Sequence, residues 1–373
     1  MTTGANLTEK RDGIQVFTPD MVRIHWRARI SRTRAAILSR VSILLPVHNA
    51  AATLAETLDS MRQQDFGDYE VIAVDDGSSD GSPEILRRYA ALDSRIRIFL
   101  RPHAGLVDSL NFGLAQCRAD YIARMDADDV MLPPRLGRQA AFLDRHPEIA
   151  LVASRVELIS DRPLRRGWEL YLDWQNGCLG PEQIANNIYW EAPFVHPSVM
   201  LRSEVFERLG PYRAGDFPED YELWLRMHAN GLRMAKLPEV LLHWREHANR
   251  MTHRDPRLSV DAFNRVRMRY LAADARIRQA ARVVVWGAGR KTRKRLRRLL
   301  EAGVRPAAWV DIDPRKIGGR VDGAPVIEPE ALALLKPRPL VLAAVRSHGA
   351  RALIEARLVE FGFRAGIDYL VVG

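Results

Sequence analysis

The chain has 373 residues, 47% hydrophobic content and a net charge of +10, which suits a basic globular protein of two domains and excludes a disordered chain. Its longest apolar runs, at 41–47 and 339–345, are far shorter than the roughly 20 residues that cross a bilayer. We therefore expect no transmembrane helix and, because the polar amino terminus lacks a secretory signal, a cytoplasmic protein.

Residues 1–40 form a basic amino-terminal extension. Its segment from Met21 to Arg40 is amphipathic and contains Trp26. The pattern predicts a helix that packs on the main domain, or one that lies at the inner face of a membrane as a peripheral contact. A basic chain can also attract nucleic acid. Net charge is the only feature that favours a nucleic-acid partner, so we expect none.

From residue 41 onward, short apolar strands alternate with helices. The pattern predicts strands at 41–46, 69–74, 96–100, 121–125 and 149–158. It predicts helices at 51–63, 82–91 and 106–117, and another that ends near 146. Alternation of this kind is typical of an α/β fold with a mostly parallel sheet and right-handed crossovers.

Acidic side chains follow two of these strands. Asp75 and Asp76 end one strand, and Asp126 and Asp128 follow another. Each cluster alone is also ordinary turn or helix-cap chemistry. Ligands of open α/β sheets bind beyond the carboxyl ends of the strands, where both clusters are expected. Carboxylates there suit Mg²⁺ or Mn²⁺ carrying a phosphorylated ligand, so the sequence predicts a nucleotide site.

The segment from 161 to 191 has no clear periodicity and is rich in aromatic residues. These residues predict either an acceptor groove or a buried aromatic core. They are Trp168, Tyr171, Trp174, Tyr189 and Trp190.

A second domain is predicted at 281–373, after a helical linker at 258–280. A strand runs into the turn Gly287-Ala288-Gly289, and Asp311 follows about twenty residues later, as in a Rossmann fingerprint. Thr292 stands at the third glycine position. This Rossmann-like domain either binds a nucleotide or is a scaffold for assembly. A scaffold is favoured because the segment holds only half of a dinucleotide fold.

Four ordered motifs, taken together, resemble the family 2 glycosyltransferases of the GT-A fold. They are VSILLPVHN at 41–49, VDDGSSD at 74–80, DADD at 126–129 and PEDYELWLR at 218–226. The resemblance covers roughly residues 40–255. It implies a transferase that takes a sugar from a nucleotide-diphosphate sugar and inverts the anomeric centre. UDP is the commonest donor nucleotide in that family.

The resemblance assigns donor-binding roles to the first two motifs. Pro46, His48 and Asn49 are expected to shape the first loop against the nucleotide. Asp76 is expected to accept a hydrogen bond from the base, with Asp75 supporting the same loop.

The remaining donor and metal roles fall on the third motif and on the segment Trp244-Arg245-Glu246-His247, which resembles a Tyr-Arg-x-His segment with Trp in place of Tyr. Asp126 is expected to face the ribose or the metal, and Asp128 to ligate it. Arg245 is expected to pair with a phosphate, and His247 to contact the metal or a phosphate.

Asp220 matches the general base that takes the proton from the acceptor hydroxyl. Without the other motifs, Glu219 and Asp220 would be read as helix-capping residues after Pro218. His196, Glu219 and Trp224 are expected on the acceptor side of the site.

The resemblance thus implies an inverting, metal-dependent glycosyltransferase with a saccharide or lipid-linked acceptor, of the kind that builds cell-envelope glycans. The Gln-x-x-Arg-Trp motif of processive synthases is absent from the sequence, so single additions are expected. One alternative is a non-catalytic sugar-nucleotide sensor or assembly protein. Another is a nucleotidyltransferase, which uses similar carboxylates but releases pyrophosphate.

Overall fold

The computed structural model describes residues 10–11, 14–15, 39–160, 162–163, 166–247, 250, 254–347 and 349–373. Most of the basic extension, including the predicted amphipathic helix, lies outside these residues. Within it, β1 (Lys10–Arg11) and β2 (Ile14–Gln15) form a short antiparallel pair.

The largest sheet has eight strands in the order β5-β4-β3-β6-β9-β8-β10-β7. Its first half is parallel and contains β3 (Val41–Val47), β4 (Tyr69–Asp76), β5 (Ile96–Arg101) and β6 (Tyr121–Arg124). The helices that connect these strands are α2 (Leu54–Arg62), α3 (Ser82–Leu92) and α4 (Leu106–Gln116). The βαβ pattern predicted for this half is confirmed, with element ends shifted by up to three residues.

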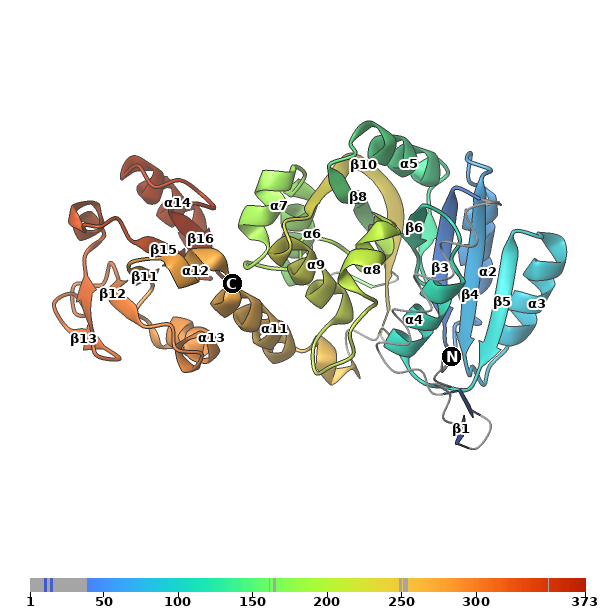
Figure 1. Cartoon of the computed structure of the whole chain (residues 1–373), viewed down its shortest axis with the longest axis horizontal. Helices are drawn as coiled ribbons and strands as arrows, with labels where there is room; N and C mark the ends of the chain where they lie inside the picture. The colour runs from blue at the N-terminus through green and yellow to red at the C-terminus, as the bar shows by residue number, and fades with distance from the viewer. Residues whose placement is uncertain are drawn as a thin grey trace, which may run out of the picture.

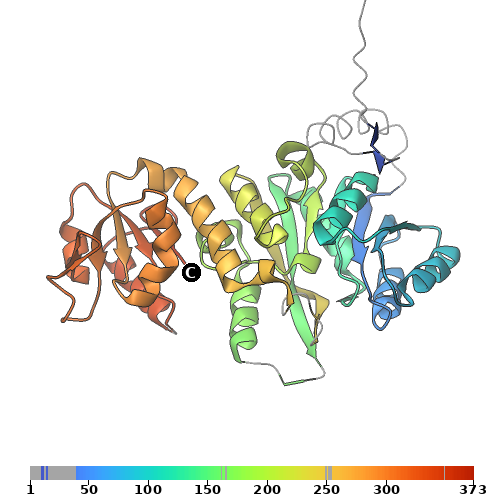
Figure 2. The ribbon, with the colours of Figure 1, turned by 90° about the horizontal axis from the view of Figure 1, so that it is seen from below.

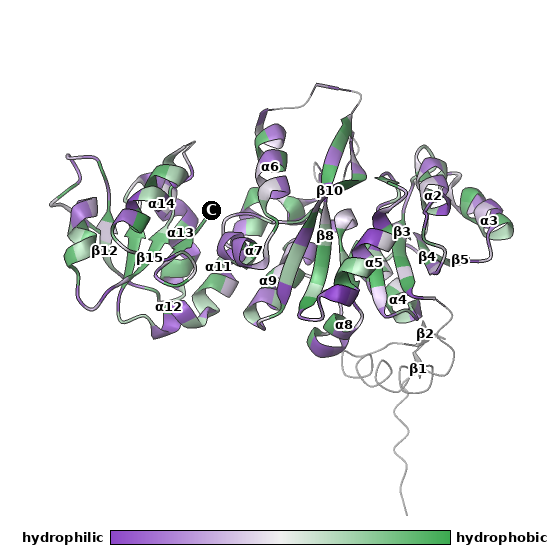
Figure 3. Ribbon diagram, turned by 90° about the horizontal axis from the view of Figure 1, so that it is seen from above, coloured by the Kyte–Doolittle hydropathy of each residue, from purple (hydrophilic) through white to green (hydrophobic). Residues whose placement is uncertain are grey.

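The second half of the sheet is mixed, which the expected run of parallel strands did not anticipate. Its strands are β7 (Val130–Met131), β8 (Ile149–Ser160), β9 (Met200–Arg202) and β10 (Arg233–Glu246). The short strand β9 runs antiparallel to both β6 and β8, whereas β10 is parallel to β8 and antiparallel to β7. Figure 3 shows β8 and β10 in the middle of the molecule, with hydrophobic residues more frequent in β8 than in β10.

Helices cover the mixed half of the sheet and fill the segment whose pattern was unclear. They are α5 (Arg135–Arg145), α6 (Arg166–Gly177), α7 (Pro181–Asn187), the 3₁₀ helix η1 (His196–Ser198), α8 (Glu204–Leu209) and α9 (Glu219–Ala229). Most of the aromatic residues predicted in this region lie on α6 or just after α7.

The predicted linker helix is broken into two. After η2 (Pro256–Leu258), α11 (Val260–Ala273) ends at Asp274 and α12 (Ala275–Gln279) begins there. The backbone of Asp274 is extended, and its carboxylate accepts the amide hydrogen of Arg276. An aspartate that caps a new helix in this way competes with continuation of the first one.

The carboxyl-terminal unit, residues 283–373, contains a six-stranded sheet in the order β13-β14-β12-β11-β15-β16. Its elements are β11 (Val283–Trp286), α13 (Arg290–Glu301), β12 (Pro306–Val310), β13 (Arg320–Val321), β14 (Ala324–Ile327), η3 (Pro329–Leu334), β15 (Leu340–Ala343), α14 (Ala350–Glu360) and β16 (Tyr369–Val371). Figures 1 and 2 show this sheet beside the rest of the chain, with α11 running between them.

Buried contacts join the carboxyl-terminal unit to the larger sheet. The guanidinium of Arg267 on α11 donates to the carbonyl oxygen of Gly373 and forms an ion pair of 3.1 Å with Glu191. The amide of Gly373 donates to the carbonyl of Tyr189 at 2.9 Å. One apolar cluster contains residues of both parts, Ile188 and Leu370 among them.

In the part of the chain that the structure describes, no helix is long and apolar enough to span a bilayer.

Candidate functional site

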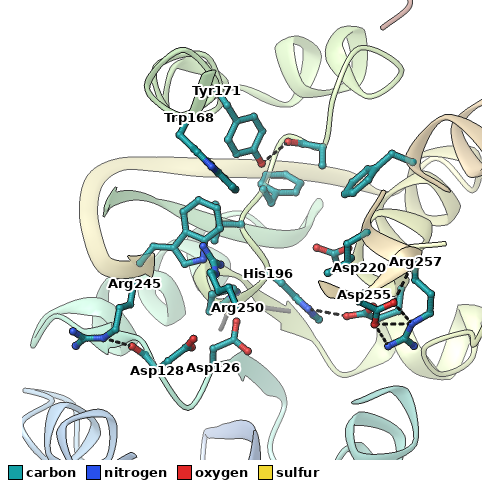
Figure 4. Close-up of a pocket in the computed structure, with 18 of the residues that line it drawn as sticks. Asp126, Asp128, Trp168, Tyr171, His196, Asp220, Arg245, Arg250, Asp255 and Arg257 are labelled. Atoms are coloured by element: carbon teal, nitrogen blue, oxygen red, sulfur yellow. Dashed lines mark hydrogen bonds and ion pairs between the residues drawn. The ribbon is translucent and has the colours of Figure 1, made fainter. Parts of the chain in front are cut away.

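A pocket of about 1860 Å³ runs from the carboxyl ends of β3 and β4 to the carboxyl-terminal unit. Its walls bring together Asp76, Asp126, Asp128 and Asp220, which the sequence had assigned to one site. Figure 4 shows Asp126 and Asp128 on one side of it and Asp220 across from them, with His196 between. Pro46, His48, Asn49, Glu219, Arg245 and His247 also line the pocket.

Asp76 lines the end of the pocket that is formed by the carboxyl ends of β3 and β4. Its two carboxylate oxygens accept backbone amide hydrogens from Ala104 and Gly105, at 2.8 and 2.9 Å. Burial alone would raise the pKa of Asp76, but these bonds outweigh it and hold the pKa below the usual value. His103, which no motif had singled out, stacks on His48 with ring centroids 4.5 Å apart. Asp76 therefore stays ionised beside two imidazoles.

Asn49 and Asp75, from the first two motifs, hold the loop that follows β4. Asn49 adopts a left-handed conformation (φ 50°), and its Oδ1 accepts the amide hydrogen of Ser79 at 2.8 Å. Asp75 is buried, and its Oδ2 accepts the amide hydrogen of Ser78. Asp75 thus supports the loop from behind, as expected of it, and it is not among the residues that line the pocket.

Three carboxylates form the acidic cluster, defined here as Asp126, Asp128 and Asp129, with ligand atoms within 4.8 Å of one another. Asp126 forms an ion pair with the buried guanidinium of Arg124. Asp128 Oδ2 lies 2.9 Å from His247 Nε2. Burial is the largest single influence on Asp128 and raises its pKa, but the hydrogen bond with His247 and the charges of Arg250 and His247 together outweigh burial, so the net shift is downward.

Asp129 is the residue of this cluster that the sequence analysis did not single out. Its Oδ1 accepts the amide hydrogen of Arg245 at 2.8 Å, and its buried Oδ2 has no partner among the described residues. Burial, followed by the charges of Asp128 and Asp126, raises its pKa well above the ordinary value. Crowded carboxylates with an unsatisfied oxygen and a nearby imidazole fit a hard divalent cation such as Mg²⁺ or Mn²⁺.

Side chains from other elements hold the acidic cluster in place. The hydroxyl of Thr53, just before α2, donates to the carbonyl of Ala127, and that of Thr57, on α2, donates to the carbonyl of Asp129, each at 2.9 Å. Arg245 donates from Nε to the carbonyl of Asp128 at 2.8 Å and pairs with Glu56 at 2.6 Å. Contact between Arg245 and a phosphate would use its remaining N–H groups.

Asp220 lies in the first turn of α9, on the opposite wall from the acidic cluster. Its Oδ1 accepts the amide hydrogen of Tyr221 at 2.6 Å. Burial and the charge of Glu219 raise the pKa of Asp220 to about 6. Burial also opposes ionisation of Glu219, but His196, whose Nδ1 lies 3.6 Å from Glu219 Oε1, lowers the pKa of Glu219 overall. The pKa values of the two adjacent carboxyl groups are therefore shifted in opposite directions, which is common at acid–base sites.

Trp224 was expected on the acceptor side, and the structure corrects this. Its side chain is fully buried, and its indole ring packs edge-on against Phe194 and His196. Trp224 therefore supports the wall that carries His196 and does not face a ligand. His196 itself is buried, and its Nε2 lies 3.1 Å from the Tyr212 hydroxyl.

The glycine turn of the carboxyl-terminal unit is filled by the protein's own groups. The amide of Ala288 donates to Asp311 at 3.1 Å, and Lys316 forms an ion pair of 3.0 Å with the same carboxylate. The hydroxyl of Thr292 donates to the carbonyl of Ala344. The acid that would bind a ribose in a Rossmann site thus pairs internally.

Comparison with known proteins gives the family. The model of glycosyl transferase family 2 matches residues 42–210. The amylovoran biosynthesis glycosyltransferase AmsE of Erwinia amylovora is 31% identical over 204 residues, which cover 54% of this chain and 74% of that protein. The chain belongs to glycosyl transferase family 2. A second relative of this glycosyltransferase is the O-antigen biosynthesis glycosyltransferase WbnJ of Escherichia coli, at 29% identity over 57% of this chain and 81% of that one.

Solved structures agree with the fold. This glycosyltransferase resembles TarS 1–349 of S. aureus, crystallised with UDP-GlcNAc, with a TM-score of 0.51 and 19% identity. The match covers 63% of this chain and 66% of that one. At this identity the likeness shows the fold alone, and the chain has the GT-A fold that its motifs predicted.

Proposed function

We propose that this glycosyltransferase inverts the anomeric centre, depends on a divalent metal and adds single sugars to a saccharide or lipid-linked acceptor. The observation that carries the proposal is that Asp126, Asp128 and Asp220 line one pocket from opposite walls. A donor held at the first two carboxylates therefore presents its anomeric carbon to an acceptor hydroxyl beside the third.

The acidic cluster is the proposed site of the metal, with Asp128, Asp126 and His247 as the predicted ligands and Asp129 added by the geometry. Mn²⁺ or Mg²⁺ bound there would stabilise the negative charge of the departing nucleotide diphosphate. Asp76 and the stacked imidazoles of His48 and His103 support a nucleotide base at the other end of the pocket.

Asp220 is the proposed general base. A pKa of about 6 leaves Asp220 mostly ionised at neutral pH and makes it a stronger base than an ordinary carboxylate. The proton moves from the acceptor hydroxyl to the free oxygen of Asp220 as the oxygen of the acceptor attacks the anomeric carbon. The bond between the anomeric carbon and the nucleotide diphosphate breaks as the new glycosidic bond forms, and the configuration inverts because attack comes from the face opposite the leaving group.

The proposed class of acceptor is supported by the names of related proteins. AmsE and WbnJ are named for amylovoran and O-antigen biosynthesis, which supports a place in cell-envelope glycan synthesis. TarS was crystallised with UDP-GlcNAc, which supports a nucleotide-diphosphate sugar with UDP as the first nucleotide to test. Assembly of such glycans on the inner face of the membrane fits the expected cytoplasmic location.

The deciding experiment is thermal unfolding with a panel of UDP, GDP and dTDP sugars, each with and without Mn²⁺. A ligand that binds only the folded state raises the unfolding midpoint. We expect one nucleotide class to do so in a metal-dependent way, and the effect to be lost in Asp128→Ala. Mass analysis of the products should then show a nucleoside diphosphate and a glycosylated acceptor, and the NMR signal of the anomeric proton should show the inverted configuration.

Other outcomes would redirect the assignment. Release of pyrophosphate from a nucleoside triphosphate would indicate nucleotidyl transfer. Binding of a donor with no turnover in the presence of acceptors, by the wild-type protein, would indicate a sensor.

A further inference from the structure

The pocket continues past Asp220 to the carboxyl-terminal unit, beyond the region that the family model matches. There it is lined by Arg346, which follows β15, and by Arg351, in the first turn of α14. We call these two residues the arginine pair. Both guanidinium groups lie over the ring of Trp190, at 5.4 and 4.9 Å from its centroid. The larger sheet and the carboxyl-terminal unit thus build this end of the pocket together.

The arginine pair and the neighbouring Arg267 carry three positive charges, and they pair with only two carboxylates among the described residues. Glu191 is shared between Arg346, at 2.7 Å, and Arg267, at 3.1 Å, so one carboxylate faces two guanidinium groups. Arg351 pairs with Glu355 at 2.9 Å through Nε. Its Nη1 is buried and has no hydrogen-bond partner within the described part of the chain. A buried guanidinium N–H without an acceptor costs free energy, and an anionic ligand would remove that cost.

Aromatic and carboxylate groups connect the arginine pair with the proposed base. The hydroxyl of Tyr171 donates to the carbonyl of Ala192 at 3.2 Å, next to Glu191. Burial raises the pKa of Tyr171, and the charges of Glu191 and Asp220 add to the rise. Trp168, Tyr171 and Trp190 all line this stretch of the pocket. Such rings suit the apolar faces of sugar units between two polar ends.

We propose that the arginine pair binds a negatively charged group of the acceptor, a phosphate or a carboxylate, and that the carboxyl-terminal unit is therefore part of the acceptor site. This inference rests on the proposed function, because it takes Asp220 as the place where the acceptor hydroxyl reacts. Two guanidinium groups offer paired N–H donors that match the oxygens of phosphate and carboxylate. A lipid diphosphate and an acidic saccharide share this chemistry.

The test uses the full-length protein in EDTA, so that the acidic cluster cannot hold a diphosphate through a metal. Calorimetric titrations with farnesyl diphosphate and with glucuronic acid separate the two sources of the anion, and farnesol and glucose are their uncharged counterparts. The variants are Arg346→Ala, Arg351→Ala and, as the matched control, Arg357→Ala. Arg357 lies on the same helix but pairs with Glu330 and Glu360 away from the pocket.

We expect at least one anionic probe to bind the wild type and Arg357→Ala equally, and to bind each pocket variant about tenfold more weakly or worse. The uncharged counterparts should not bind. Arg346→Lys and Arg351→Lys should recover only part of the affinity, because lysine cannot bind bidentately. Failure of both anionic probes to bind the wild type, or equal binding by the alanine variants, would overturn the proposal.

A second measurement on the same samples separates this inference from the proposed function. Stabilisation by donor and Mn²⁺, and slow hydrolysis of the donor by water, should be unchanged in both pocket variants. If the donor binds and is hydrolysed but no anionic probe binds, the acceptor inference fails and the proposed function stands. If an anionic probe depends on the arginine pair but no donor binds, the proposed function fails instead.

Discussion

The Nε2 atom of His247 lies 2.9 Å from Oδ2 of Asp128, although 119 residues separate the two along the chain. The long strand β10 makes this contact, because it pairs with β7 directly after the acidic cluster and ends just before His247. The carboxylate-rich loop and the imidazole therefore form one site only in the folded chain.

A metal-binding role for this contact predicts a specific defect in His247→Ala. Loss of a group that ligates a metal or orients its ligand typically weakens metal binding by about 10- to 100-fold. We expect the Mn²⁺ concentration for half-maximal transfer to rise by about that factor, with the maximal rate at saturating Mn²⁺ much less affected. A titration of activity against Mn²⁺ measures this. His146→Ala is the control, because that imidazole lies after α5, outside the pocket lining.

Removal of the metal should have the same effect on transfer activity as loss of the Asp128 carboxylate. We expect EDTA to abolish transfer by the wild type, and Mn²⁺ or Mg²⁺ to restore it. Asp128→Asn should show neither donor-dependent stabilisation nor restored activity, whereas Asp120→Asn should behave as the wild type. Asp120 is exposed just before the amino end of β6, whereas the acidic cluster follows the carboxyl end of that strand. Full activity in EDTA would contradict metal dependence.

Asp220→Asn tests the base separately from donor binding. General base catalysis typically contributes about 10²- to 10⁴-fold, so we expect kcat to fall by that order while donor and Mn²⁺ still stabilise the protein. Asp216→Asn is the matched control, since that exposed carboxylate precedes α9, pairs with Arg265 and does not line the pocket. Retention of full transfer activity by Asp220→Asn would assign the base to another residue.

The raised pKa of Asp220 also predicts a pH profile. The base must be ionised, so kcat/KM should rise with pH through about 6 and then level off. Burial and the charge of Glu219 both disfavour ionisation of Asp220, so removal of that charge should lower its pKa. In Glu219→Gln the inflection should therefore move to lower pH. Burial should still keep it above the pKa of an ordinary aspartate. An unchanged inflection would mean that another group sets the profile.

The parallel half of the sheet was predictable because each strand and helix there has its own local pattern. In the mixed half, the strand predicted at 149–158 is present as β8, but β9 and β10 were not predicted. β9 has only three residues, too few for a periodicity, and β10 runs through Pro238 with register shifts on either side of it. Its pairing with β8 depends on contacts between distant segments, which no local window contains.

The site was predictable where residue type alone carries the chemistry, as at Asp128. Sequence could not tell which of several adjacent groups faces the pocket. Trp224 lies one turn after Asp220 on α9, but that turn is covered by Phe194 and His196. Asp129 is the buried member of its cluster, and only the fold shows its unpaired oxygen. His103 reaches the pocket through stacking on His48, for which its own segment gives no signal.

Close packing beneath the site predicts a strong effect at Gly113 on α4. A Cβ added there would lie 2.5 Å from Leu44 Cδ1 and 2.9 Å from Val74 Cγ2, in the core behind the strands that carry the first two motifs. Overpacking of this kind usually costs about 1–3 kcal/mol, so Gly113→Ala should lower the unfolding midpoint in heat and in urea. Gly167→Ala on α6 is the control, because a Cβ there meets nothing within 4 Å. That variant should be neutral or slightly stabilised, since alanine favours helix over glycine. Equal midpoints for the two variants would show that α4 can move away from the sheet without cost.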